Sequence, residues 1–188
     1  MTQQQRAPRA DSLRNRAKIL DAARSRITES GRDVAMTDIA ASAGVAVGTL
    51  YNHFPTKVDL VAAVMDEYVR QVADRSEELR AAVEADLQTG GAAVTEFLQF
   101  VLDASAVNHA VKVVAQTMGS PTAEDSPDEA RAARALAFLL RAAQQEGVVR
   151  EGVTVQDVYL LVNSAPLDSP KQARDRWLDL VSHGIRAD

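Results

Sequence analysis

The stretch GVAVGTLYNHFPTK, residues 44 to 57, decides how the rest of this sequence is interpreted. It holds two glycines, a Tyr-Asn-His run and a lysine two positions after a proline. Protein interiors seldom carry such residues side by side, because buried polar groups need hydrogen-bond partners. Small and polar residues with a lysine are instead typical of a surface that meets phosphates and base edges. The stretch therefore predicts an exposed binding surface.

Two short helices are predicted around this surface, over residues 37–43 and 47–53. Gly44 marks the tight turn between them, and two short helices joined in this way form a helix-turn-helix. Leu50 and Phe54 are spaced i and i+4, which places both on the inner face of the second helix. Its outer face is left with Gly48, Thr49, Asn52 and His53, with Tyr51 at the edge.

The chain as a whole predicts an all-α fold. Apolar residues recur at spacings of three and four, and no segment alternates as a strand would. Start and stop signals divide the chain into about nine helices, with a compact unit over residues 1–56 and a larger bundle over 57–188. The expected helices span residues 12–30, 37–43, 47–53, 57–83, 92–104, 107–118, 127–146, 154–163 and 170–186.

Charge is distributed unevenly along the 188 residues, although the formal net charge is −5. Residues 1–60 carry nine Lys or Arg against six Asp or Glu, and the remainder carries twelve against twenty. A basic end on an acidic protein is expected to meet a polyanion such as nucleic acid, and a basic helix that faces only solvent is the alternative. The first basic residues form either an arm that touches DNA or a disordered basic tail, and residues 1–10 are expected to be disordered. These basic residues are Arg6, Arg9, Arg14, Arg16 and Lys18.

Other classes of function are not indicated. The chain has no cysteine, which excludes disulfides and thiolate metal sites, and its three histidines show no ligand spacing. The sequence contains no phosphate loop, no His-x-x-x-His and no serine elbow, so no enzyme, metal or cofactor is predicted. No apolar run approaches the ~20 residues of a membrane span, and no signal peptide is recognisable. We therefore expect a cytoplasmic protein without membrane contacts.

The stretch TDIAASAGVAVGTLYNHFPTKVDL, Thr37 to Leu60, resembles the DNA-binding domain of TetR-family transcriptional regulators. The upstream ILDAARSRITESG and the closing RWLDLVSHGIR resemble the first and last helices of that family. The resemblance implies a homodimeric one-component regulator, more often a repressor, whose residues 1–56 bind a palindromic double-stranded DNA operator. Residues 57–188 would then dimerise and hold a small effector. A helical DNA-binding or protein-interaction module without an effector is the alternative.

The resemblance also implies roles for single residues. Thr37 would cap its helix against a phosphate. Val47, Gly48 and Thr49 would approach base edges, while Tyr51, His53 and Lys57 would hold backbone phosphates and Asn52 would share their outward face. Ala46 cannot cap the recognition helix, which costs about 1 kcal/mol, and Val47 offers only apolar contact, as to a thymine methyl. Direct base readout is therefore expected to be thin, with a contribution from DNA shape.

Two further sites are expected in the C-terminal bundle. Polar residues of a mid-chain segment and a later helix predict a ligand cavity, lined by Asn108, His109, Gln116, Met118, Tyr159 and Asn163. A lone histidine in such a helix is more often structural, and that alternative stays open. The helices at 127–146 and 170–186 carry more apolar surface than one inner face needs, which predicts an isologous four-helix dimer interface. Its expected residues are Leu136, Phe138, Leu139, Leu140, Trp177, Leu178 and Val181.

Overall fold

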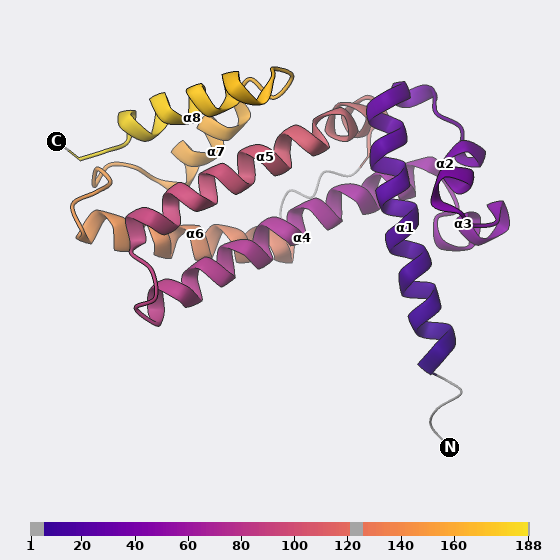
Figure 1. The fold of residues 1–188 in the computed structure, drawn as a ribbon, viewed down its shortest axis with the longest axis horizontal. Helices are drawn as coiled ribbons and strands as arrows, with labels where there is room; N and C mark the ends of the chain where they lie inside the picture. The colour runs from indigo at the N-terminus through magenta and orange to yellow at the C-terminus, as the bar shows by residue number, and fades with distance from the viewer. Residues whose placement is uncertain (1–5, 121–125, 188) are drawn as a thin grey trace. The chain divides into compact units, whose positions relative to one another are not determined.

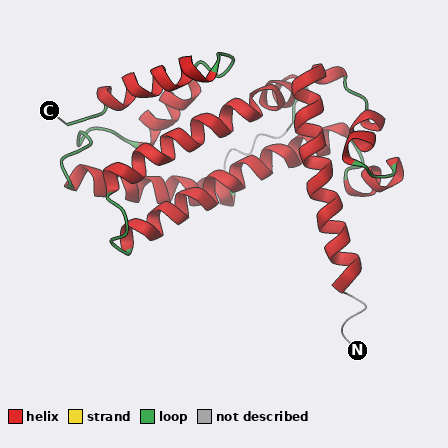
Figure 2. Ribbon diagram, in the orientation of Figure 1, coloured by secondary structure: helices red, strands yellow, loops and turns green. Residues whose placement is uncertain are grey.

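The computed structural model describes residues 6–120 and 126–187, and in this part of the chain the regular elements are helices joined by loops (Figures 1 and 2). Its extended backbone pairing is limited to one isolated bridge, between Val149 and Arg186. The elements in order are α1 (Arg6–Ser30), η1 (Gly31–Asp33), α2 (Met36–Ala43), α3 (Val47–His53), α4 (Lys57–Glu84), α5 (Gly90–Thr117), α6 (Pro127–Gln145), α7 (Val155–Asn163) and α8 (Lys171–Gly184). The all-α prediction is confirmed. Among the helices described, none has the length and apolarity needed to cross a membrane.

The largest departure from the predicted helices lies in α5. The sequence predicts two helices there, over 92–104 and 107–118, whereas the structure has a single helix, Gly90–Thr117. The prediction is wrong because the segment contains no residue that ends a helix. The Ser105 hydroxyl is hydrogen-bonded to the Tyr68 hydroxyl of α4 at 2.9 Å. No glycine or proline lies between residues 92 and 118 to end the helix.

The first helix begins earlier than predicted, at Arg6 instead of residue 12. Residues 6–10 of the expected arm are therefore helical, while residues 1–5 of that arm lie outside the described part of the chain. Pro8 is compatible with this start, because the first turn of a helix has backbone N–H groups without helical partners. The other helices, apart from α5, begin and end within two residues of the prediction.

The chain packs as two compact units, and the first comprises Met1–Glu67 and Ala110–Ala123. Its core joins α1, α2 and α3 to the first turns of α4 and the last turns of α5. Leu60 and Val64 of α4 and Val111 of α5 are buried in this core. The packing unit thus extends past residue 56. The DNA-binding domain is predicted to end at residue 56. This boundary concerns function, not packing, and it stays a prediction.

The second unit comprises Tyr68–His109 and Glu124–Asp188. In it the remainder of α4 and of α5 form a bundle with α6, α7 and α8 (Figure 1). Its core is filled from each helix, by Leu79 of α4, Leu102 of α5, Leu136 of α6, Val158 of α7 and Leu178 of α8. The apolar periodicity of the sequence produces this core, because each helix buries one face.

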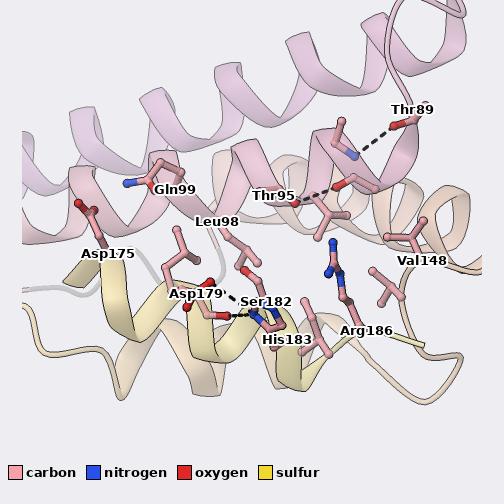
Figure 3. Close-up of a pocket in the computed structure, with 16 residues that line it drawn as sticks. Thr89, Thr95, Leu98, Gln99, Val148, Asp175, Asp179, Ser182, His183 and Arg186 are labelled. Carbon is pink, nitrogen blue, oxygen red and sulfur yellow. Dashed lines mark hydrogen bonds and ion pairs between the residues drawn. The ribbon is translucent and has the colours of Figure 1, made fainter. Parts of the chain in front are cut away.

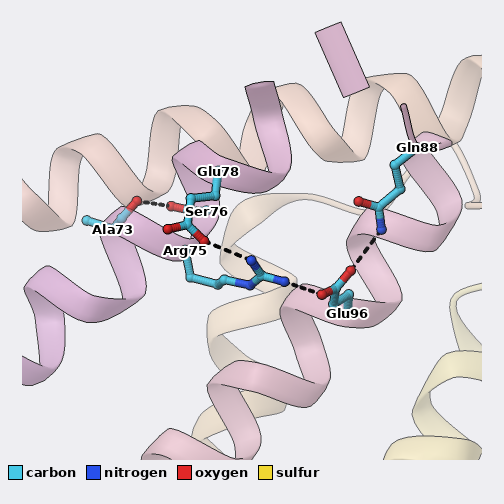
Figure 4. Close-up of polar contacts among 6 residues, drawn as sticks. All are labelled: Ala73, Arg75, Ser76, Glu78, Gln88 and Glu96. Carbon is cyan, nitrogen blue, oxygen red and sulfur yellow. Dashed lines mark hydrogen bonds and ion pairs between the residues drawn. The ribbon is translucent and has the colours of Figure 1, made fainter. Parts of the chain in front are cut away.

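A polar network joins α4 to α5 at the surface of the second unit (Figure 4). Arg75 of α4 pairs with Glu78 at 2.8 Å and also with Glu96 of α5. Gln88 donates to the Glu96 carboxylate at 2.9 Å. That hydrogen bond, followed by the charge of Arg75, lowers the pKa of Glu96. Because exposed pairs contribute at most about 1 kcal/mol each, the network specifies the register of the two helices more than it stabilises the fold.

The start of α5 is closed by a residue from the end of α6. The Glu146 carboxylate accepts hydrogen bonds from the backbone N–H groups of Gly90, at 2.6 Å, and Gly91, at 2.9 Å. A β-carbon at Gly90 would lie 2.5 Å from the backbone nitrogen of Ala143. The cap therefore requires close approach of two backbones, and only glycine at position 90 allows it.

We expect Gly90→Ala to lower the free energy of unfolding by about 3 kcal/mol, because the methyl group overpacks a backbone contact and displaces the Glu146 cap. Urea unfolding followed by circular dichroism measures this. Gly152→Ala is the matched control, since a β-carbon there meets nothing within 4 Å. Equal stabilities of the two variants would contradict this account of the α5–α6 junction.

Candidate nucleic-acid interface

The turn between α2 and α3 depends on Gly44. Its φ of 66° is left-handed, and its N–H closes the last turn of α2 onto the carbonyls of Ala40 and Ala41. The N–H of Val45 bonds the Ala40 carbonyl at 3.1 Å, which completes the helix stop. The chain then turns and α3 begins at Val47. The predicted helix-turn-helix is therefore present, with its turn where the sequence predicts it.

Burial divides α3 into two faces as predicted. Leu50 and Phe54 are 0% and 4% exposed and belong to the core of the first unit. The opposite face carries Val47 and Tyr51, which are 40% and 45% exposed. The remaining members of this outer face are Gly48 and Asn52, which are exposed, and Thr49 and His53, which are half-buried. The predicted base-contacting and phosphate-contacting residues of α3 thus share one accessible, mostly small surface.

Nothing within the fold explains the glycine at position 48. A β-carbon built on Gly48 would have no heavy atom within 4 Å, and its backbone is helical. Glycine inside a helix is less stable than alanine by up to ~1 kcal/mol. The chain therefore keeps a destabilising residue at an open position on the outer face. Glycine at this position leaves the outer face of α3 open at its backbone.

The N-termini of α2, α3 and α4 differ in whether a side chain caps them. Ala46 is the N-cap of α3 and supplies no side-chain hydrogen bond, as predicted. Thr37 is not the N-cap of α2, because that helix begins at Met36 with Ala35 as its cap, so Thr37 lies exposed in the first turn. Thr56 and Asp59 form the predicted capping box of α4, since the Thr56 N–H donates to the Asp59 carboxylate at 2.9 Å and the Asp59 N–H donates to the Thr56 hydroxyl at 3.1 Å.

Lys57 makes a contact that the sequence does not predict. Its ammonium group donates to the backbone carbonyl of Arg32, in η1, at 2.6 Å. The side chain therefore links the turn after α1 to the start of α4. Two further ammonium protons are available for other acceptors. The predicted contact with phosphate is thus compatible with this internal role.

The expected ligand residues fall into both units. In the first unit, Gln116 is exposed and Met118 packs against the core. In the second unit, Asn108 is buried and donates to the Ala104 carbonyl at 2.8 Å. His109 Nε2 lies 3.0 Å from the Asp168 carboxylate, which gives this histidine a structural partner. Of the other two expected residues, both on α7, Tyr159 is half-buried and Asn163 is exposed.

A polar cluster in the bundle of the second unit was not predicted as such. It contains the hydrogen-bonded hydroxyl groups of Tyr68 and Ser105, and burial raises the pKa of Tyr68. Burial also raises the pKa of Tyr159, assisted by the negative charge of Glu129 and by Tyr68. The Tyr68 phenol is therefore neutral and hydrogen-bonded inside the bundle. We call Tyr68 and Ser105 the interior polar cluster.

Two surface grooves of the second unit involve α8. One has a volume of about 610 Å³, and Figure 3 shows Thr95 and Gln99 of α5 across from Asp179 and His183 of α8. His183 already contacts the Asp179 carbonyl at 2.7 Å. The other, of about 720 Å³, is more apolar and lies along α7 and α8. None of the six expected ligand residues lines either groove.

The expected dimer residues divide by burial. Leu136, Leu139, Leu140 and Leu178 lie in the core of the second unit and offer almost no surface to a partner. Phe138, Trp177 and Val181 are half-buried. Two leucines that were not expected are more exposed, Leu160 of α7 at 69% and Leu180 of α8 at 56%. Both line the apolar groove with Trp177 and Val181.

Comparison with known sequences and structures decides the family. The family described as bacterial regulatory proteins, tetR family, matches residues 19–64, and the SbtR-like transcriptional regulator C-terminal domain matches residues 89–187. A TetR transcription regulatory protein from Mycobacterium vanbaalenii is 33% identical, with a TM-score of 0.74 over 95% of this chain and 99% of that chain. The chain belongs to the TetR family of transcriptional regulators.

Other relatives agree with this assignment. A TetR regulator from Streptomyces coelicolor is 28% identical, with a TM-score of 0.70 over 92% of this chain and 98% of that one. An HTH-type transcriptional regulator of Staphylococcus aureus is 39% identical over 43% of this chain and 44% of its own length. This chain thus spans less than half of that relative. The TetR assignment confirms the predicted class of protein, a transcriptional regulator and not an enzyme.

Proposed function

We propose that this TetR-family chain is a one-component regulator that binds a palindromic operator as a homodimer, with repression as the usual output. The outer face of α3 is the observation that carries the proposal. Gly48 is unexplained by the fold, lies in open space and is flanked by exposed Val47 and half-buried Thr49. A helix with such a face can bring its backbone close to base edges in a major groove.

The proposed roles follow the accessibility of each side chain. Val47 contacts a thymine methyl group, and Thr49 and Asn52 offer hydrogen bonds to base edges or sugars. Tyr51, His53 and Lys57 hold backbone phosphates, while exposed Thr37 reaches a phosphate from the first turn of α2. With so few base-reading groups, the shape of the DNA contributes to the choice of sequence.

The dimer interface is proposed along α7 and α8, shifted from the α6 and α8 pair that the sequence suggested. Leu160 and Leu180 expose apolar area that a single chain leaves uncovered, and both line the groove that also holds Trp177. A two-fold axis through this surface would pair each groove with its copy and bury these side chains. Half-buried Phe138 of α6 stays a candidate at its edge.

The effector site is proposed at the interior polar cluster. The cluster combines the Tyr68 phenol with the buried Ser105 hydroxyl, which suits a small ligand that has both apolar and hydrogen-bonding groups. α4 and α5 each have residues in both units, so a ligand that prefers one arrangement of these helices can change operator affinity. A DNA-binding module without an effector is the competing proposal.

Selection against a random duplex library, at two salt concentrations, tests the operator proposal. We expect a palindromic motif. We then expect Gly48→Ala to raise the free energy of unfolding by up to ~1 kcal/mol and to weaken operator binding about tenfold or more, because its methyl group meets the DNA. Circular dichroism melting of Gly48→Ala is the control, because a variant that is more stable yet binds less tightly has lost a contact with DNA and not its fold. Unaltered binding of Gly48→Ala would argue against close approach at this residue.

Leu180→Glu is expected to turn the dimer into a monomer, because a carboxylate would be buried at the two-fold contact. Light scattering coupled to gel filtration measures the mass. Leu87→Glu is the matched control, since Leu87 is 81% exposed and lies outside both grooves described above. A dimeric Leu180→Glu variant, with unchanged mass, would place the interface elsewhere.

A small-molecule library screened by thermal shift, and then by release of operator DNA, tests the effector proposal. A compound that raises the Tm and releases DNA should bind Tyr68→Phe about tenfold more weakly, because this variant loses one buried hydroxyl. Thr95→Val removes a hydroxyl in a surface groove instead and serves as the control. If no compound both binds and releases DNA, the module without an effector is the better description.

A further inference from the structure

The arginines of α1 have different electrostatic partners. Three of them form local ion pairs with a carboxylate one turn away along the helix. These pairs are Arg14 with Asp11 at 2.7 Å, Arg24 with Asp21 at 3.0 Å and Arg26 with Glu29 at 2.6 Å. Arg16 is different, because in the part of the chain that the structure describes no carboxylate pairs with it. Its charge is therefore not neutralised by the helix that carries it.

Arg16 is instead held by an aromatic ring at the end of α3. Its guanidinium carbon lies 5.6 Å from the centroid of the Phe54 ring, within the range of a cation–π contact. Phe54 is only 4% exposed and directly follows α3, so its ring is fixed by the core. The His53 ring lies 6.1 Å from the same ring. The Phe54 ring is therefore close both to the Arg16 charge and to His53, a proposed phosphate contact.

Stacking leaves the guanidinium ready to bind a second group. A guanidinium group carries five N–H donors, and contact with an aromatic ring leaves donors available for hydrogen bonds to other groups. Part of the side-chain entropy that binding would cost is already lost, because the stack restricts the rotamers of Arg16. A planar fork of donors held in this way fits two oxygens of one phosphate.

We propose that Arg16 binds a phosphate of the operator backbone and extends the DNA interface from α3 onto α1. This inference rests on the proposed function of operator binding. Arg16 lies before residues 19–64, the stretch that matches the tetR family, whereas its partner Phe54 lies within that stretch. Phosphate carries no base identity, so the contact strengthens binding to all duplexes and leaves the preferred sequence unchanged.

The test measures operator affinity against salt concentration by fluorescence anisotropy, with the duplex that selection returns. Loss of one phosphate contact lowers the slope of log affinity against log salt by about one. We expect Arg16→Ala to show this decrease with the same preferred motif. Arg16→Lys keeps the charge but loses the planar fork, and it should fall between wild type and Arg16→Ala.

Arg26→Ala is the matched control. Arg26 lies on the same helix, and its charge is paired with Glu29 at 2.6 Å. The variant removes the same charge from α1 and should leave the slope as in wild type. An equal decrease for Arg26→Ala would show a general effect of helix charge and would overturn the assignment of Arg16.

The outcomes separate this inference from the proposed function. A wild-type protein that selects no duplex overturns both. A wild-type protein that binds its motif, together with Arg16→Ala of unchanged salt slope, overturns the phosphate contact alone. Circular dichroism melting of each variant identifies any loss of fold. If Arg16→Ala unfolds, the salt slope of Arg16→Lys is compared with that of the wild type, since this variant retains an aliphatic stem and the charge.

Discussion

The burial of Leu50 and Phe54 fixes which side of α3 the molecule presents. The two side chains lie one turn apart and are held in the core by α1, α2 and the first turns of α4. A helix of seven residues has little stability of its own, so tertiary packing holds it in place. Its outer face is then free to carry residues that do not help folding. Gly48 and uncapped Ala46 are two such residues, and both weaken the helix that the core stabilises.

Local signals made much of the fold predictable from sequence. Gly44 ends α2, Thr56 and Asp59 cap α4, and Ser126 caps α6 by accepting from the Glu129 N–H at 3.0 Å. These features act over three or four residues, so a single sequence reveals them. The core face of α3 was also predictable, because helical periodicity alone separates Leu50 from Gly48. The class of regulator followed from the same short segment.

Contacts between distant residues explain what the sequence did not predict. Ser105, where a break in α5 was expected, is hydrogen-bonded to Tyr68, which lies 37 residues earlier. Four of the expected dimer residues are buried because neighbouring helices of the same chain cover them. An amphipathic pattern shows that a face is apolar and does not show which partner covers it. The stack of Arg16 on Phe54 likewise joins residues that no local spacing connects.

A recognition face this sparse has a consequence for how a TetR-family dimer would choose its operator. Each good base contact discriminates by about 1–3 kcal/mol, and α3 offers few side chains able to make one. Two identical helices bound to a palindrome double that discrimination, because the free energies of well-separated contacts add. Phosphate contacts position each helix without adding to discrimination. The selectivity of the proposed dimer therefore depends on the spacing between its two α3 helices as much as on the residues of either one. An effector that alters this spacing would therefore change the specificity without contacting any residue of α3.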